Sequence, residues 1–196
     1  MPSPRGIFRL KQVYEEQLSD NWSVKSDVWL SPSPFFQSWD YGYFGGGLSP
    51  SPAIYSTVDR IDYTNDTATA APKGPLSVAR SGPGATGNSS FGYFGGGNPG
   101  PVSTVDRIDY SNDTATASPK GPLSLARNSL AATGNSSYGW FGGGGPFSTV
   151  DRIDYSNDTA TAAPKGPLSV ARYGMVQQVI VLMVGLVVVI FLLLRQ

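Results

Sequence analysis

The sequence contains no cysteine and no histidine. Without cysteine the chain can form no disulfide and offers no thiol nucleophile, and its redox compartment leaves no trace in the sequence. Zinc sites are built mainly from cysteine and histidine, and histidine is the commonest general base. These two absences exclude the usual zinc sites and the histidine-dependent classes of enzyme.

Charge is also scarce. Charged residues make up 14% of the 196 residues, and 14 Lys and Arg balance 14 Asp and Glu. Nucleic-acid-binding proteins usually show a basic excess on one face, so no nucleic-acid partner is expected. Glycine and proline are abundant instead, at 24 and 16 residues. Large aliphatic residues are few before Tyr173, which favours a fold that stacks copies of one small unit.

One stretch organises the chain because it occurs three times with few substitutions. Its copies are Ser56 to Arg80, Ser103 to Arg127 and Ser148 to Arg172. An aromatic-glycine block precedes each copy, at Tyr41 to Gly47, Phe91 to Gly97 and Tyr138 to Gly144. Most of the length variation falls between block and copy, as is typical of a surface loop. A residue that recurs at one repeat position is more typical of a structural unit than of a single active site.

Each copy predicts four short strands. The elements expected in the second copy are a strand at Tyr93 to Gly96 that ends in tight glycines, a half-buried strand at Val105 to Tyr110, a turn at Ser111 to Asp113, a short strand at Thr114 to Ala117 broken by Pro119, and Leu130 to Thr133 leading into the next block. Tight glycines permit positive φ or close backbone approach. Four strands in roughly 45–50 residues is typical of a β-propeller blade.

The glycine block, the Val-Asp-Arg-Ile-Asp strand, the turn and Gly-Pro-Leu-Ser-x-Ala-Arg together resemble a Kelch-type repeat across residues 41 to 172. The resemblance implies three blades, at about 41–90, 91–137 and 138–172. Thr-Ala-Thr-Ala departs from it by replacing the usual tryptophan, and three blades are fewer than a closed ring needs. The fold expected is therefore an all-β repeat, partial or completed by oligomerisation. The amino-acid sequence of these repeats also resembles repeats in virion-associated proteins of marine bacteriophages and large algal DNA viruses.

Residues 1–40 differ from the repeats and predict an N-terminal cap. Apolar residues recur at three- and four-residue steps, which predicts a short amphipathic helix, at Ile7, Leu10, Val13, Tyr14 and Leu18. This helix could pack on the same protein or dock another subunit. Residues 23–40 indicate a short strand and a proline-rich connection in place of the first strand of the first repeat. No secretory signal peptide is indicated.

Residues 175–194 predict a transmembrane helix. From Val179 to Leu194 no polar side chain interrupts the run. Twenty helical residues span about 30 Å, the thickness of a bilayer's hydrocarbon core. Arg172 and Arg195 bracket the segment, and the alternative, a buried core helix, lacks a polar face. We therefore expect a single-pass C-terminal anchor.

Candidate chemistry is limited to carboxylates and aromatics. Asp59, Asp62 and Asp66 recur in every copy and could bind Ca²⁺ or serve a glycosidase. The alternative is strand-surface charge paired with Arg60 plus a turn cap, and we favour it because the spacing matches no EF-hand loop. The glycine blocks lack the features of a phosphate loop. Aromatic side chains could stack on sugars or pack between blades: Tyr93, Phe94, Trp140 and Phe141.

The sequence therefore predicts no catalytic, metal-binding or cofactor-binding residue and no enzymatic activity. We expect a membrane-anchored structural or recognition protein that associates with itself or with capsid subunits, because exposed sheet edges favour association. Its place would be a virus particle, where it links a protein shell to a membrane or displays a binding surface. The alternative is a cellular tail-anchored adaptor whose blades bind a protein partner.

Overall fold

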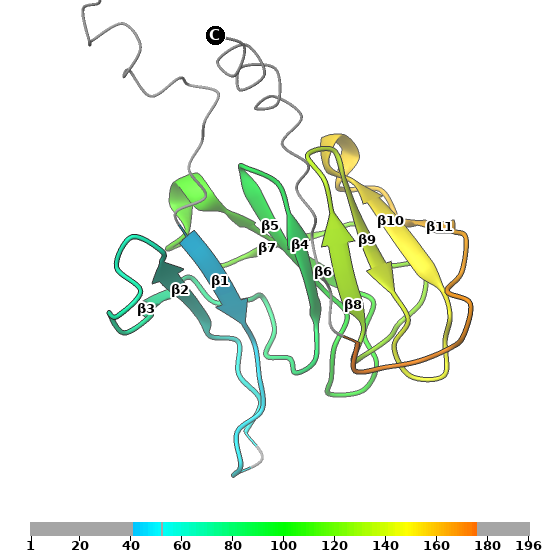
Figure 1. The fold of residues 1–196 in the computed structure, drawn as a ribbon, viewed down its shortest axis with the longest axis horizontal. Coiled ribbons are helices and arrows are strands. Elements are labelled where there is room, and N and C mark those ends of the chain that lie inside the picture. Colours follow the sequence, from blue (N-terminus) through cyan, green and yellow to red (C-terminus); the bar gives the residue numbers. More distant parts are fainter. Residues whose placement is uncertain (1–40, 52, 176–196) are drawn as a thin grey trace, which may run out of the picture. The chain divides into compact units, whose positions relative to one another are not determined.

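The computed structural model describes residues 41–51 and 53–175, and these form three antiparallel sheets (Figure 1). The first sheet contains β1 (Tyr41–Gly45), β2 (Val58–Asp62) and β3 (Ala71–Lys73). The second contains β4 (Gly84–Gly87), β5 (Phe91–Gly95), β6 (Val105–Asp109) and β7 (Ser118–Lys120). The third contains β8 (Ala131–Gly134), β9 (Tyr138–Gly142), β10 (Val150–Asp154) and β11 (Ala163–Lys165). The predicted all-β repeat is confirmed.

The three repeats fold in the same register. Within each sheet every strand pairs with the next strand in the chain. The third aromatic residue of each glycine block lies opposite the first aspartate of the Val-Asp-Arg-Ile-Asp strand, in the pairs Phe44–Asp59, Phe94–Asp106 and Phe141–Asp151. Equivalent positions in the sequence are therefore equivalent positions in space.

The glycine blocks have the conformation expected of them. Gly96 and Gly97, which follow β5, have φ values of 73° and 115°, and the corresponding glycines of the other blocks are also positive. Only glycine enters this region at little cost. A 3-10 turn, η1 (Tyr110–Asn112), follows β6, and its counterpart η2 (Tyr155–Asn157) follows β10.

The strand expected at Thr114 to Ala117 is misplaced. Thr114 and Ala115 continue the turn, Thr116 and Ala117 are irregular, and the strand is β7, which includes Pro119. Proline is tolerated because β7 is an edge strand that pairs only with β6, so its missing N–H interrupts no ladder. Ala117 pairs with no strand. Its N–H donates to the carbonyl of Pro75, which follows β3 of the first sheet, at 2.8 Å.

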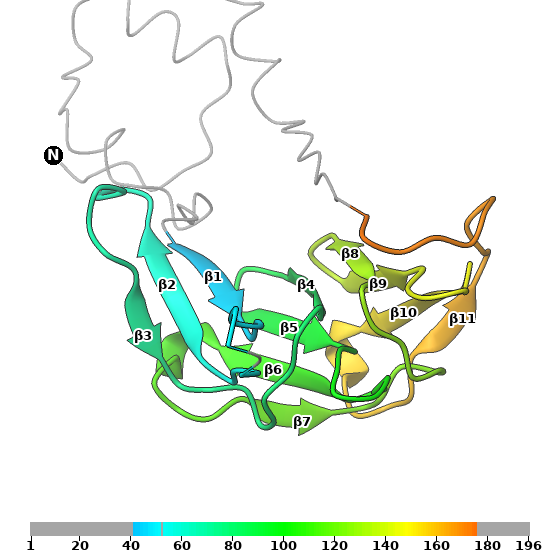
Figure 2. The ribbon, with the colours of Figure 1, turned by 90° about the horizontal axis from the view of Figure 1, so that it is seen from below.

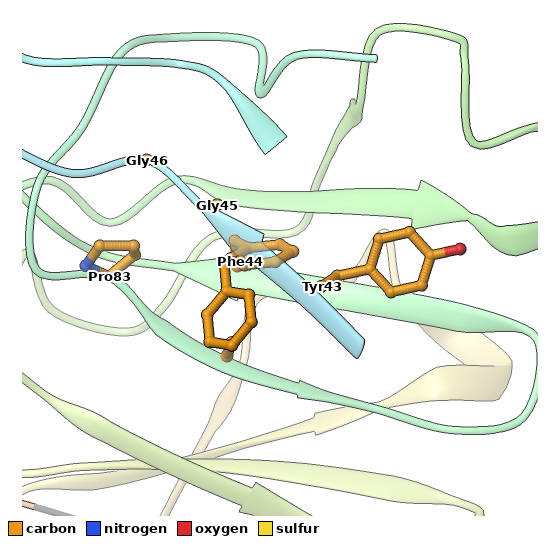
Figure 3. A pocket seen from close by; sticks show the side chains of 7 residues that line it. Tyr43, Phe44, Gly45, Gly46 and Pro83 are labelled. Carbon is orange, nitrogen blue, oxygen red and sulfur yellow. The ribbon is translucent and has the colours of Figure 1, made fainter. Parts of the chain in front are cut away.

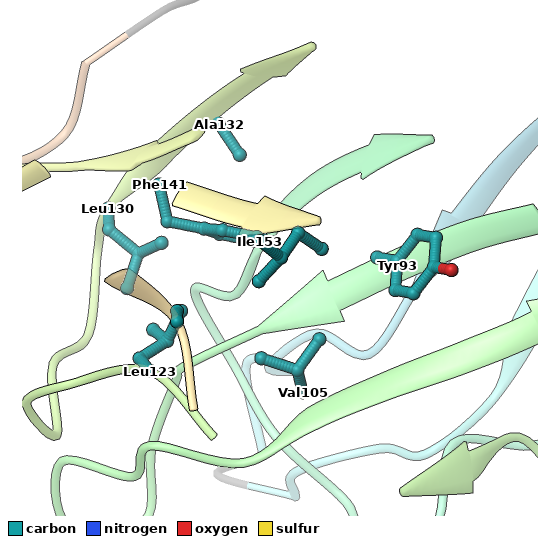
Figure 4. Close-up of a cluster of buried hydrophobic side chains, with 8 residues drawn as sticks. Tyr93, Val105, Leu123, Leu130, Ala132, Phe141 and Ile153 are labelled. Atoms are coloured by element: carbon teal, nitrogen blue, oxygen red, sulfur yellow. The ribbon is translucent and has the colours of Figure 1, made fainter. Parts of the chain in front are cut away.

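The core lies between the sheets. The second sheet lies between the first and the third (Figures 1 and 2). One buried cluster fills the space between the second and third sheets (Figure 4) and consists of Tyr93, Val105, Leu123, Leu130, Ala132, Phe141, Ile153 and Ala162. The other joins the first and second sheets and consists of Val58, Leu76, Phe94, Ile108 and Ala117. Each sheet thus buries its neighbour's face, as stacked repeats require.

Two predicted elements lie outside the described residues. They are the N-terminal helix and cap within residues 1–40, and the anchor from Met175 to Leu194, of which only Met175 is described. In the part of the chain that the structure describes, no helix has the length and apolar character to span a bilayer.

Candidate functional site: the junctions between repeats

Each copy of the repeated stretch ends in the seven residues Gly-Pro-Leu-Ser-x-Ala-Arg, and the first two of these segments connect one sheet to the next. We call residues 74–80, 121–127 and 166–172 the junction segments. The backbone of the first junction segment is hydrogen-bonded to residues of its own repeat. Leu76 N–H donates to Ser56 O at 2.8 Å, and Gly47 N–H donates to Arg80 O at 2.9 Å. The side chains of this segment reach the second sheet. The second segment relates to the third sheet in the same way, so the chain has a first and a second junction.

A buried ion pair holds the first junction. Arg80 Nη2 lies 2.8 Å from Asp106 Oδ2, and their side chains are 2% and 0% exposed. Arg80 Nη1 also donates to the carbonyls of Gly96 at 3.2 Å and Thr104 at 3.0 Å. Ser77 donates its N–H and its hydroxyl to Asp106, at 3.0 and 2.6 Å. Both buried charges are therefore paired and hydrogen-bonded, the condition under which burial of ions is tolerated.

The second junction repeats these contacts. Arg127 Nη2 lies 2.8 Å from Asp151 Oδ2, and both side chains are 0% exposed. Arg127 Nη1 donates to the carbonyls of Gly143 at 2.5 Å and Thr149 at 2.8 Å. Ser124 donates its N–H at 3.1 Å and its hydroxyl at 2.5 Å to Asp151. We refer to both as the Arg–Asp pairs.

The turn aspartate of each later repeat gathers a second set of contacts, which we call the aspartate cluster. At the first junction Asp113 accepts from Tyr43 at 3.0 Å and from Arg60 at 2.8 Å, with Lys73 at 3.4 Å. At the second junction Asp158 has the equivalent partners Tyr93, Arg107 and Lys120 at 3.0, 2.8 and 3.8 Å. Every partner belongs to the preceding repeat.

Backbone contact brings the repeats closest at the first residue of each junction segment. Gly74 N–H donates to Asp113 O and Gly121 N–H donates to Asp158 O, both at 2.8 Å. A Cβ added to Gly74 would overlap the carbonyl of Ala115, and one added to Gly121 would overlap that of Ala160. Glycine is therefore required here for close approach rather than for a special φ.

The three recurring aspartates have three different roles. Asp106 and Asp151 belong to the Arg–Asp pairs, and Asp113 and Asp158 belong to the aspartate clusters. Asp109 caps the turn, because it accepts from Ser111 N–H at 2.9 Å and from the Ser111 hydroxyl at 2.6 Å. These hydrogen bonds lower the pKa of the Asp109 carboxyl. The expected turn cap is confirmed.

The expected pairing with Arg60 is correct in kind but wrong in place. Arg60 pairs with Asp113 of the next repeat, whereas the prediction placed its partner within the same copy. Sequence spacing identified which residues are equivalent but contained no signal for the repeat to which a side chain reaches. The Arg80 and Arg127 partners were missed for the same reason.

Tyr93, Phe94 and Phe141 pack between the sheets, as predicted, whereas Trp140 is half-buried and contacts Tyr138 of its own strand. Tyr93 and Phe141 are 0% exposed and Phe94 is 4% exposed. Tyr43 stacks on Tyr110 of the next repeat with ring centroids 4.9 Å apart, and Tyr93 stacks on Tyr155 at 4.8 Å. These rings are therefore part of the junctions.

A hollow of about 300 Å³ lies beside β1 (Figure 3). Its lining includes Tyr43, Phe44 and Gly45 on β1 and Pro83 and Ala85 near β4. Ala85 pairs with Phe94, and Phe44 is the equivalent of Phe94. The hollow therefore occupies the place next to β1 that β4 takes next to β5. Its lining offers hydrophobic and backbone contacts and no ionisable group other than the Tyr43 phenol, and that phenol is bonded to Asp113.

The first aspartate cluster should make stability fall at alkaline pH. Burial and the bond to Asp113 raise the pKa of Tyr43 from 10.0 to about 12. The unfolded chain loses this proton first, so the stabilisation is present below pH 10 and is lost as pH rises towards about 12. We expect Tyr43→Phe to show a smaller loss of unfolding free energy over this range in denaturant titrations. Tyr41→Phe, the same change on the same strand, should retain the wild-type slope; equal slopes for all three proteins would contradict the assignment.

Searches with the sequence found no protein-family model that matches the chain and no curated protein that matches it.

Proposed function

We propose that this chain is a Kelch-like repeat protein with a structural or recognition role and no enzymatic one. The observation that carries the proposal is the use made of buried charge. Among the described residues, the buried charged side chains are Arg80, Asp106, Asp113, Arg127 and Asp151. All of them belong to the two junctions, where they hold sheets together. Charges committed in this way support assembly of a scaffold.

The setting we propose is a virus particle. The chain would be anchored in a membrane by residues 175–194 and would link a protein shell to that membrane or display a binding surface. Two sequence features support this: the uninterrupted apolar run from Val179 to Leu194, and the resemblance of the repeats to those of virion-associated proteins. The three sheets would then be the displayed part.

Fractionation of purified particles tests this proposal. We expect the protein in the particles, resistant to salt washing and released by detergent, because an apolar helix is held by the bilayer and not by charge. A chain that lacks residues 175–196 should no longer sediment with membranes. Absence of the protein from particles would overturn the virion role, and continued sedimentation of the shortened chain would overturn the anchor.

A further inference from the structure

The third junction segment has the same backbone anchorage as the other two but no sheet beyond it among the described residues. Leu168 N–H donates to Ser148 O at 2.8 Å and Gly144 N–H donates to Arg172 O at 2.9 Å. These bonds match those of the first segment. The Ser169 and Arg172 side chains are nevertheless exposed, and the hydrogen bond of the Arg172 guanidinium goes from Nε to Met175 Sδ at 3.2 Å. The third junction segment therefore has the backbone conformation of the other two, but its Ser169 and Arg172 side chains contact no further sheet among the described residues.

The first sheet presents the complementary surface. Asp59 is the equivalent of Asp106 and Asp151, and no arginine reaches it in the described part of the chain. Phe44 is 65% exposed, whereas its equivalents Phe94 and Phe141 are 4% and 0% exposed. Tyr63, whose equivalents stack on aromatic rings of the preceding repeat, is 55% exposed. We call this surface, with Asp66, the front face.

The components of a further aspartate cluster lie on the first and third repeats, where they do not meet. Asp66, the equivalent of Asp113 and Asp158, is exposed. Its missing partners would be the equivalents of Tyr93, Arg107 and Lys120, which are Trp140, Arg152 and Lys165 of the third repeat. Arg60 and Arg107 each form an ion pair with the aspartate of the next repeat, whereas Arg152 forms none within the described part of the chain. We call the surface formed by Trp140, Arg152, Lys165, Gly142 and the third junction segment the back face.

Two glycines of the back face have room that their equivalents lack. A Cβ on Gly95 would lie 2.7 Å from Phe141, whereas one on Gly142 would meet only ordinary contacts at 3.7 Å or more. A Cβ on Gly121 would overlap Ala160 O, whereas one on Gly166 would meet nothing within 4 Å. The two spaces correspond to the places that Phe44 and the carbonyl of Ala68 would take.

We infer that the back face of one copy docks on the front face of a second copy and forms a junction like the two within the chain. Arg172 and Ser169 would bind Asp59 of the second copy, and Arg152 and Lys165 would bind its Asp66. The charges are opposite in both contacts, and each contact has two internal precedents at fixed geometry. The occupant is therefore a second copy of this chain.

The number of copies follows if the proposed Kelch-like propeller is correct, and this step rests on that proposal. Propellers close with about four to eight sheets. One copy supplies three sheets, so two copies, with six, give the whole-number solution in that range. A head-to-tail contact closes into a ring when its rotation allows, which removes both free faces.

Complementation between two half-blocked chains tests the inference. Asp59→Arg blocks only the front face, and Gly166→Ala blocks only the back face. The full-length wild type in detergent micelles should have the mass of two copies by sedimentation. Each variant alone should be monomeric, with its dimer dissociation constant raised about 100-fold or more. A mixture of the two should recover dimers, because one unaltered front face then meets one unaltered back face.

Asp62→Arg provides the matched control, since it makes the same charge reversal on the same strand outside the junction, and it should remain dimeric. A monomeric wild type, variants that dimerise as the wild type does, or a mixture that stays monomeric would each overturn the inference. Assemblies larger than two copies would overturn closure by a pair. None of these outcomes bears on the anchor or the virion role, which fractionation of particles tests separately.

Discussion

Replacing Asp151 with asparagine is expected to lower the free energy of unfolding by about 3–5 kcal/mol. The substitution preserves shape and an acceptor for Ser124 but leaves the guanidinium of Arg127 without a counter-ion. Both side chains are 0% exposed, so water cannot replace the lost partner. Removal of one member of a buried pair costs more than the pair contributes, because an uncompensated charge remains in the interior. Denaturant unfolding of the full chain in detergent measures the loss.

Asp154→Asn is the matched control for this change. Asp154 lies three residues further along β10 and is partly exposed to solvent, and it accepts from the Ser156 N–H at 2.9 Å. An asparagine oxygen can accept that bond, so stability should be nearly unchanged. Asp151→Asn combined with Arg127→Met should recover part of the loss, since no charge is then buried alone. Equal effects of the two asparagine variants would show that the buried pair does not hold the junction.

The sequence predicts the fold of one repeat well, because the signals that determine it are local. The charged and β-branched strand is β6, and the aromatic block that ends in glycines is β5. The turn residues cap their own backbone, as Asp109 does. Only the last strand differs from the prediction, because Pro119 is typical of a strand break but is tolerated where a strand pairs on one side at a sheet edge.

The sequence could not predict the junctions, because they join residues of different repeats. Asp106 is 26 residues from Arg80 and 47 residues from Asp59. Asp59 and Asp106 occupy equivalent positions in the repeat, and their neighbours along the sequence are the same. The structure separates them, because one accepts an arginine from the preceding repeat and the other has none in the described residues. The difference between an internal and a terminal copy is a property of neighbours, which a repeated sequence does not encode.

The second large effect is expected from Gly121→Ala, which should lower the free energy of unfolding by about 3 kcal/mol. The added methyl group would overlap the carbonyl oxygen of Ala160. That oxygen belongs to the backbone of the turn that follows β10, so no side-chain rotation can relieve the overlap. The repeats would have to separate, and the bond from Gly121 N–H to Asp158 O at 2.8 Å would lengthen.

Gly166→Ala is a closely matched control because the surrounding sequence, Pro-Lys-Gly-Pro-Leu-Ser, is identical at both sites. An added methyl group at Gly166 meets nothing within 4 Å. At protein concentrations too low for association, this variant should unfold like the wild type, since dimer formation adds stability only by mass action. The two alanines have the same helix and strand propensities, so the difference between them isolates the contact across the second junction. If Gly121→Ala were as stable as Gly166→Ala, the second and third repeats would not approach as closely as their backbone hydrogen bonds require.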